Sequence, residues 1–246
     1  MILLFVMDKL KQISIALNKL NYGFFLSIIL MVSFILLFSS LDKIASSYTV
    51  KDLEISQTKL IEDQSKYKHM IGIVHNIGNK TANQIVITAN FFDDSKKSIG
   101  NFSKQTELRA LNPDEITPFD ILILDPKKSE KIHNNTMELK YNFTDPKAKK
   151  LDIVSNDSRL DMTGFFFVNG KIKNTGGSDS NNTNIISILY NKDRELIGVW
   201  KAQTEPYNIP PLATASFTIP ITDKTQSFQI SSYTLLTDSD NYSGLN

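Results

Sequence analysis

A segment of 71 residues occurs twice in this chain, 98 positions apart, and this repeat constrains the fold more than any other feature. Leu53–Ile123 aligns with Leu151–Ile221 without a gap, and 17 of the 71 aligned pairs are identical. Chance at ordinary composition would make only roughly 6% of the pairs identical. Both copies contain Gly-x-(Val/Ile)-x-Asn-x-Gly, at Gly72–Gly78 and at Gly170–Gly176. The repeat predicts two copies of one folding unit, with boundaries at residues 51–146 and 147–246 and a link near Thr144–Lys150.

Within the first copy, short apolar runs alternate with turn-forming residues such as those of Asp93–Lys97. The expected strands are Lys68–Val74, Ala82–Phe92, Ser98–Ser103, Thr117–Leu124 and Thr136–Phe143. Alternation with period two and turns every 8–12 residues are typical of all-β sandwiches. The Gly72–Gly78 stretch lacks the lysine-serine ending and the following helix of a phosphate-binding loop, so we interpret it as a strand exit and turn.

The order of these signals resembles the FxLyD domain, an immunoglobulin-like β-sandwich module of prokaryotic envelope proteins. In the first copy the matching residues are Gly72, Val74, Asn76, Gly78, Phe92, Asp93, Ile99, Gly100, Leu111, Pro113 and Phe119. In the second they are Gly170, Ile172, Asn174, Gly176, Leu189, Tyr190, Ile197, Gly198, Ile209, Pro211 and Phe217. The chain departs from the pattern where Ala89 and Ser187 replace the eponymous Phe, and where Asn191 replaces the Asp. The resemblance implies two tandem immunoglobulin-like domains outside the cytoplasm and supplies no catalytic residues.

The segment Tyr22–Leu41 holds twenty residues without a charge, enough for a helix of roughly 30 Å that crosses the hydrocarbon layer. It is longer than the apolar region of a signal peptide, although a cleaved signal peptide and a buried core helix remain alternatives. Three lysines precede it against one aspartate, which by the positive-inside rule keeps the N-terminus in the cytoplasm. The expected order is a cytoplasmic segment at 1–21, a signal-anchor helix at 22–41, a stalk at 42–50 and then the exported domains. Met1 and Met7 are both possible starts.

Composition excludes several function classes. The 27 Lys and Arg nearly balance the 26 Asp and Glu, so no strong net field favours nucleic acid as a partner. The chain has no Cys, which removes disulfides, thiolate metal sites and a cysteine nucleophile. Of the three histidines, His69 and His75 share a strand face with Ile71 and Ile73, and His75 is expected to be solvated. No metal site, no cofactor and no catalytic residues are predicted, and the acidic pairs Asp93-Asp94 and Asp114-Glu115 are interpreted as turns.

Two sets of residues are candidates for contact or modification. Phe165, Phe167, Trp200 and Tyr207 supply aromatic surface for a partner or a ligand, with packing between the two domains as the alternative. Seven sequons for N-glycosylation begin after the expected span, at Asn79, Asn101, Asn134, Asn142, Asn156, Asn181 and Asn241. The sequence predicts a single-pass envelope protein, not an enzyme, whose domains contact another envelope or secreted protein. The alternatives are a glycan- or ligand-binding module and an accessory subunit of a membrane complex.

Overall fold

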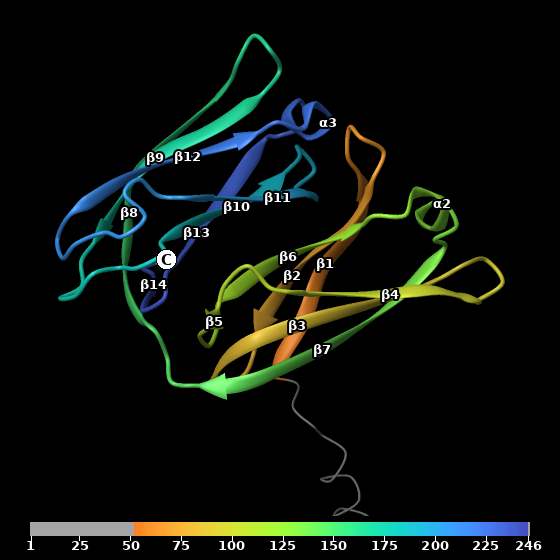
Figure 1. Cartoon of the computed structure of the whole chain (residues 1–246), viewed down its shortest axis with the longest axis horizontal. Helices are drawn as coiled ribbons and strands as arrows, with labels where there is room; N and C mark the ends of the chain where they lie inside the picture. Colours follow the sequence, from red (N-terminus) through yellow and green to blue (C-terminus); the bar gives the residue numbers. More distant parts are fainter. Residues whose placement is uncertain (1–51, 246) are drawn as a thin grey trace, which may run out of the picture. The chain divides into compact units, whose positions relative to one another are not determined.

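The computed structural model describes residues 52–245, and the expected span at Tyr22–Leu41 lies outside them. Within residues 52–245 no helix has both the length and the apolar character needed to cross a bilayer. The described chain consists mainly of β-strands, which confirms the all-β prediction (Figure 1).

The elements of the first repeat are β1 (Leu53–Glu62), β2 (Lys68–Asn76), β3 (Thr81–Phe92), β4 (Ser98–Gln105), β5 (Ala110–Leu111), β6 (Ile116–Ile123), α2 (Pro126–Ser129) and β7 (Asn134–Thr144). Those of the second are β8 (Ala148–Leu160), β9 (Phe166–Asn174), β10 (Asn184–Tyr190), β11 (Leu196–Gln203), β12 (Thr214–Ile221), α3 (Lys224–Ser227), β13 (Ser232–Asp238) and β14 (Tyr242–Gly244). Adding 98 to the bounds of β2, β4, β6 and α2 gives the bounds of β9, β11, β12 and α3. The repeat in the sequence is therefore also a repeat of secondary structure.

The five strands predicted for the first copy correspond to β2, β3, β4, β6 and β7, with ends within two residues. The strands β1 and β8 were not predicted. The helical turns α2 and α3 were not predicted either, because four-residue helices leave no periodic pattern. Within the expected link at Thr144–Lys150, β7 ends at Thr144 and β8 begins at Ala148.

Three sheets carry these strands. The first repeat has a sheet of order β1-β2-β6 and a sheet of order β4-β3-β5, in which β7 also pairs with β3. The second repeat has one sheet of order β11-β10-β13-β14-β8-β9-β12. Its extra connection is β14, which pairs antiparallel with β13 and parallel with β8. The C-terminal strand thus joins two sets of strands that stay separate in the first repeat.

A buried apolar cluster lies in each repeat. In the first, Val74 of β2, Phe91 of β3 and Phe119 of β6 are fully buried together. In the second, Ile172 of β9, Leu189 of β10 and Ile219 of β12 are likewise buried. Full burial of a side chain of this size contributes about 1.5–3 kcal/mol, so these clusters supply most of the driving force for folding.

A third buried cluster joins the two repeats. Ile71 and Ile73 of β2 pack against Ile188 of β10 and Leu196 of β11. His75, which was expected to be solvated, is partly exposed, whereas Ile71 and Ile73 on the same face are buried. The matching second-repeat positions of Ile71 and Ile73 are Asn169 and Lys171, so only the first repeat uses this face for packing.

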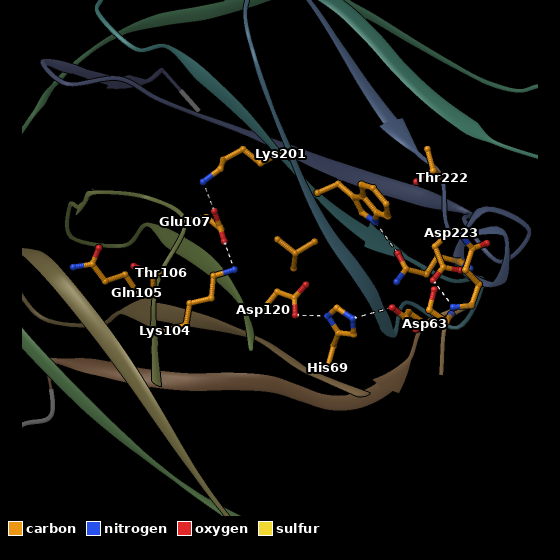
Figure 2. A pocket seen from close by; sticks show the side chains of 15 residues that line it. Asp63, His69, Lys104, Gln105, Thr106, Glu107, Asp120, Lys201, Thr222 and Asp223 are labelled. Carbon is orange, nitrogen blue, oxygen red and sulfur yellow. Dashed lines mark hydrogen bonds and ion pairs between the residues drawn. The ribbon is translucent and has the colours of Figure 1, made fainter. Parts of the chain in front are cut away.

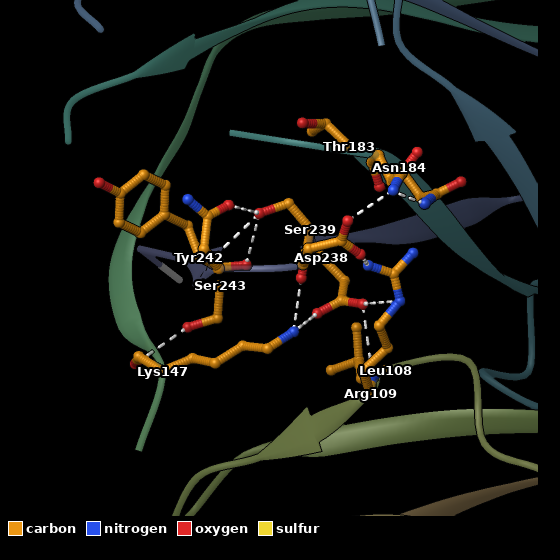
Figure 3. A network of polar contacts seen from close by, with 12 residues as sticks. Leu108, Arg109, Lys147, Thr183, Asn184, Asp238, Ser239, Tyr242 and Ser243 are labelled. Atoms are coloured by element: carbon orange, nitrogen blue, oxygen red, sulfur yellow. Dashed lines mark hydrogen bonds and ion pairs between the residues drawn. The ribbon is translucent and has the colours of Figure 1, made fainter. Parts of the chain in front are cut away.

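Polar contacts reinforce the junction between the repeats, and Figure 3 shows the network around Asp238. Asp238 is 2% exposed, and its carboxylate pairs with Lys147 at 2.8 Å and with Arg109 at 3.5 Å. Arg109 also pairs with Asp240. Burial raises the pKa of Asp238, and the two cations oppose that rise. Because a buried charge without partners is costly, this network fixes the chain at the link between the copies.

Candidate functional site

A polar groove with a volume of about 620 Å³ lies between the β1–β2 turn, β2, β4 and β6 of the first repeat and β11 and α3 of the second (Figure 2). This size suits a small ligand. We call it the polar groove; its lining residues are Asp63, Gln64, Ser65, His69, Lys104, Gln105, Thr106, Glu107, Asp120, Val199, Trp200, Lys201, Thr222, Asp223 and Gln226.

His69 occupies one side of the polar groove between two carboxylates (Figure 2). Its Nδ1 lies 2.8 Å from Asp120 Oδ1, and its Nε2 lies 3.5 Å from Asp63 Oδ2. The hydrogen bond to Asp120 raises the pKa of His69 against the lowering effect of burial, and Asp63 adds to the rise. His69 therefore holds the β1–β2 hairpin against β6 most strongly when it is protonated.

Glu107 organises the opposite side. Its carboxylate accepts from Lys201 Nζ of the second repeat at 2.6 Å and pairs with Lys104 at 3.2 Å. Burial acts to raise the pKa of Glu107, but the two lysines outweigh it and the net shift is downward. Glu107 thus stays ionised and links the two repeats.

Trp200 and α3 form the second-repeat wall. Trp200 Nε1 donates to Gln226 Oε1 at 2.7 Å, which fixes the indole at the edge of the core. Asp223 caps α3 by accepting from the amides of Thr225 and Gln226, and its other oxygen accepts from Gln64 N of the first repeat at 3.0 Å. Each carboxylate of the groove therefore has a cation or amide partner. The groove has four carboxylates against two lysines and one histidine, so it keeps a net negative charge, and it offers polar groups and one aromatic side chain.

The structure does not bring the four predicted aromatic residues together. Trp200 lines the polar groove, whereas Tyr207 is 53% exposed beside the Thr183 backbone, whose amide donates to its carbonyl. The Phe165 ring lies 5.6 Å from Lys224 Nζ, and the Phe167 ring lies 5.2 Å from the Arg159 guanidinium carbon. Phe166, which was not singled out, packs against the second core and Tyr233.

Exposed apolar side chains gather where the β8–β9 hairpin meets α3. Met162 is fully exposed, Phe228 is 68% exposed and Leu160 is 47% exposed. Gly164 lies beneath the Phe228 ring, since a Cβ there would stand 3.0 Å from Phe228 Cζ. We call Leu160, Met162, Phe165 and Phe228 the apolar tip. Sequence reasoning found Phe165 and missed the other three, although their first-repeat counterparts Glu62, Gln64 and Glu130 are all polar.

The first repeat uses the corresponding hairpin differently. Gln64, the counterpart of Met162, contacts the start of α3 through its backbone amide and its side-chain oxygen, which accepts from Lys224 N at 3.3 Å. In Figure 1 the β1–β2 hairpin lies next to α3, whereas the β8–β9 hairpin extends beyond it. Both hairpins thus contact the α3 region, the first through polar groups at its tip and the second through Gly164 and Phe165, while Leu160 and Met162 of the second stay exposed.

The remaining candidates have simple placements. All seven sequon asparagines are exposed, so each is accessible to modification. Asp93 accepts from Lys97 N within its turn, and Glu115 accepts from Asn112 and pairs with Lys149. Within residues 52–245 no group of three or more His, Asp or Glu side chains converges on a point that suits a metal ion.

No protein-family model matches the chain, and no curated protein matches it. Among solved structures, an exo-chitosanase of Amycolatopsis orientalis is 9% identical with a TM-score of 0.28, over 76% of this chain and 26% of that one. Red sea bream transglutaminase is 9% identical with a TM-score of 0.25, over 83% of this chain and 31% of that one. The chain spans less than a third of each. Similarities this low identify neither a family nor an activity.

Proposed function

We propose that this chain is a membrane-anchored extracytoplasmic protein without enzymatic activity, whose two tandem FxLyD-type, immunoglobulin-like β-sandwich modules hold another envelope or secreted protein. The anchor is the Tyr22–Leu41 helix, with the N-terminus in the cytoplasm. The two buried clusters, one centred on the strands of each repeat, support the tandem sandwich, although the first also includes Ile186 of β10. The balanced charge of the chain favours a protein partner over nucleic acid.

The observation that carries the proposal is the difference between the two hairpin tips. The first-repeat tip is polar and is used inside the chain, through Gln64 and α3. The second-repeat tip has the same backbone plan but exposes Met162, Leu160 and Phe228. Clustered exposed apolar side chains mark contact surfaces, and methionine is adaptable at such surfaces. The second tip is therefore the place where a partner docks.

Site-specific photocrosslinking in native membranes tests this role. A photoreactive residue at Met162 of the full-length chain should give one dominant crosslinked protein, identifiable by mass spectrometry. The matched control is the same residue at Gln64, which is hydrogen-bonded to the start of α3 in this chain and should give little intermolecular product. If Met162 gives no product above that of Gln64, the proposal is wrong.

The same experiment distinguishes recognition of the partner by the exported domains from recognition by the membrane helix, as expected for an accessory subunit of a membrane complex. Replacing the Tyr22–Leu41 helix with an unrelated span should leave the Met162 crosslink intact when the partner is held by the exported domains. Loss of the crosslink would place the recognition in the helix instead.

Ligand binding at the polar groove is a second candidate function. The observation that favours it is the position of Trp200 in a groove whose carboxylates are already paired. Such a groove suits a neutral polyhydroxylated molecule such as a glycan, because flat aromatic rings and amide side chains contact sugars without a net charge.

A further inference from the structure

A second groove, with a volume of about 780 Å³, lies in the first repeat between β1 and β7. It is lined by Leu53, Glu54, Ile55, Thr58 and the β7 residues Asn135–Tyr141. We call it the strand groove. Among the described residues β1 pairs only with β2, and β7 pairs only with β3. Both strands therefore turn an edge with unpaired backbone groups toward this side of the repeat.

The second repeat has the same two strands with the gap closed. Here β14 pairs with β8 on one side and with β13 on the other. Leu245 continues this segment, and its amide donates to the Leu151 carbonyl at 2.9 Å. The space left, lined by Leu151, Ile153 and Leu235 together with Gly244 and Leu245, is only about 10 Å³.

The walls of the two gaps share three apolar positions and differ at others, since Asn135 and Glu138 stand where the second repeat has Tyr233 and Leu236. Leu53, Ile55 and Met137 of the first repeat stand 98 positions before Leu151, Ile153 and Leu235 of the second. In the second repeat Tyr233 also donates to Asn156 of β8. The larger difference is the chain after the last strand. After β13 it turns back as β14, whereas after β7 it runs straight into β8. Within residues 52–245 the first repeat thus keeps these apolar wall positions, and no segment fills the gap.

We infer that the strand groove takes an extended segment of a partner protein, which adds to the β1 or β7 edge as β14 adds to β8. The unpaired backbone edges favour a peptide, because an acyl chain cannot form their hydrogen bonds, and the apolar walls favour an aliphatic side chain in the place of Leu245. The inference rests on the proposed function in one respect, that the partner is a protein, but it concerns a surface separate from the apolar tip.

Peptide capture on the full-length protein tests the inference, and the chain has no cysteine to give a background reaction. The probe is a synthetic peptide of the sequence Ser239–Asn246 with an added terminal cysteine as an activated disulfide. The Met137→Cys variant should capture this peptide at least ~10-fold faster than Asn101→Cys, an exposed position on the edge strand β4. Changing the leucine of the peptide to proline should abolish the difference, since proline lacks the amide that a ladder needs.

The duplication supplies a matched control. The Leu235→Cys variant should show no such capture, because Gly244 and Leu245 already fill its gap. Removing Gly244–Asn246 from that variant should raise its capture rate toward that of Met137→Cys. Circular dichroism checks that each variant is folded, and a small maleimide checks that the Met137→Cys thiol reacts.

Two results would overturn the inference: a reactive thiol in Met137→Cys without preferential capture, or capture that the proline peptide matches. The outcome is independent of the crosslinking at the apolar tip. A Met162→Ser variant should leave peptide capture unchanged, so failure of one proposal does not appear as failure of the other.

Discussion

Asn76 and Asn174, 98 positions apart, make the same three hydrogen bonds in the two repeats. Asn76 Nδ2 donates to the carbonyls of Lys80 and Leu111, both at 2.8 Å, and its Oδ1 accepts from Gly78 N. Asn174 makes the equivalent bonds to Ser178, Ile209 and Gly176. Both side chains are fully buried. The motif that recurs in the sequence is therefore a structural lock between a turn and a neighbouring segment.

Replacing either asparagine by alanine should destabilise the protein. Each substitution removes two side-chain donors and leaves buried carbonyls unpaired, so we expect a loss of about 3 kcal/mol in the free energy of unfolding. Urea denaturation measures it. The exposed Asn101→Ala should change stability by less than about 0.5 kcal/mol, and an equally small effect at Asn76 would show that the lock contributes little.

An alanine at Gly72 and an alanine at Gly170 should both destabilise the protein, but only the first should be tolerated better when the neighbouring phenylalanine is made smaller. A Cβ at Gly72 would lie 2.4 Å from Phe119 Cζ, and only side chains crowd it. A Cβ at Gly170 would meet Phe217 Cζ and the Ser155 carbonyl oxygen, each at 2.4 Å. We expect Gly72→Ala to cost about 2–3 kcal/mol from overpacking.

In the first repeat, Phe119→Leu combined with Gly72→Ala should cost clearly less than the sum of the single changes, because the smaller side chain makes room. The pair Gly170→Ala and Phe217→Leu should show no such relief, since the backbone oxygen remains. Thermal unfolding of the two double-mutant cycles measures both, and equal coupling in the two repeats would contradict the geometry.

The stability of the protein should depend on the titration of His69. The Asp120 carboxylate raises the pKa of His69 above its ordinary value of 6.5, so protonation favours the folded state. This contribution is fully present below pH 6.5 and is lost as the pH rises through the higher folded-state pKa. The His69→Gln variant should lack this dependence. The free energy of unfolding of both proteins, measured from about pH 5.5 to about pH 9, tests this prediction. If the wild-type free energy changes with pH in the same way as that of the variant, the role of His69 is refuted.

Trp200 is the only tryptophan of the chain, so intrinsic fluorescence reports on the polar groove alone. A neutral oligosaccharide such as chitobiose should shift or quench the emission in a saturable way if the groove binds glycans. Gln105→Ala, which alters the lining, should weaken the response, and Tyr207→Ala, which lies outside it, should not. A response confined to charged ligands, or none across a panel of neutral sugars, would exclude this second candidate.

The strand positions could be predicted because period-two alternation and turn residues are local signals. Ile71 and Ile73 show where local reasoning ends, since their burial depends on Ile188 and Leu196, more than 100 residues away. The same applies to the polar groove, whose walls join His69 to Trp200 across the two repeats.

The sequence nevertheless contains a second signal, the difference between the two copies. Positions at which the two copies differ in polarity mark the surfaces that the copies use differently. Ile71 against Asn169 marks the packed junction, and Gln64 against Met162 marks the docked and the exposed hairpin tips. Matched positions report the shared fold, and mismatched positions report what each copy does.

The labelling rate of the Met162→Cys variant with a membrane-impermeant maleimide tests the central claim most directly. Under the proposed topology, with the second repeat outside the cytoplasm, the thiol should react in intact cells before lysis. If the proposed partner covers the apolar tip, the thiol should react several-fold more slowly there than in the purified full-length protein. A thiol that reacts only after lysis would contradict the topology, and equal rates in cells and in the purified protein would contradict the partner.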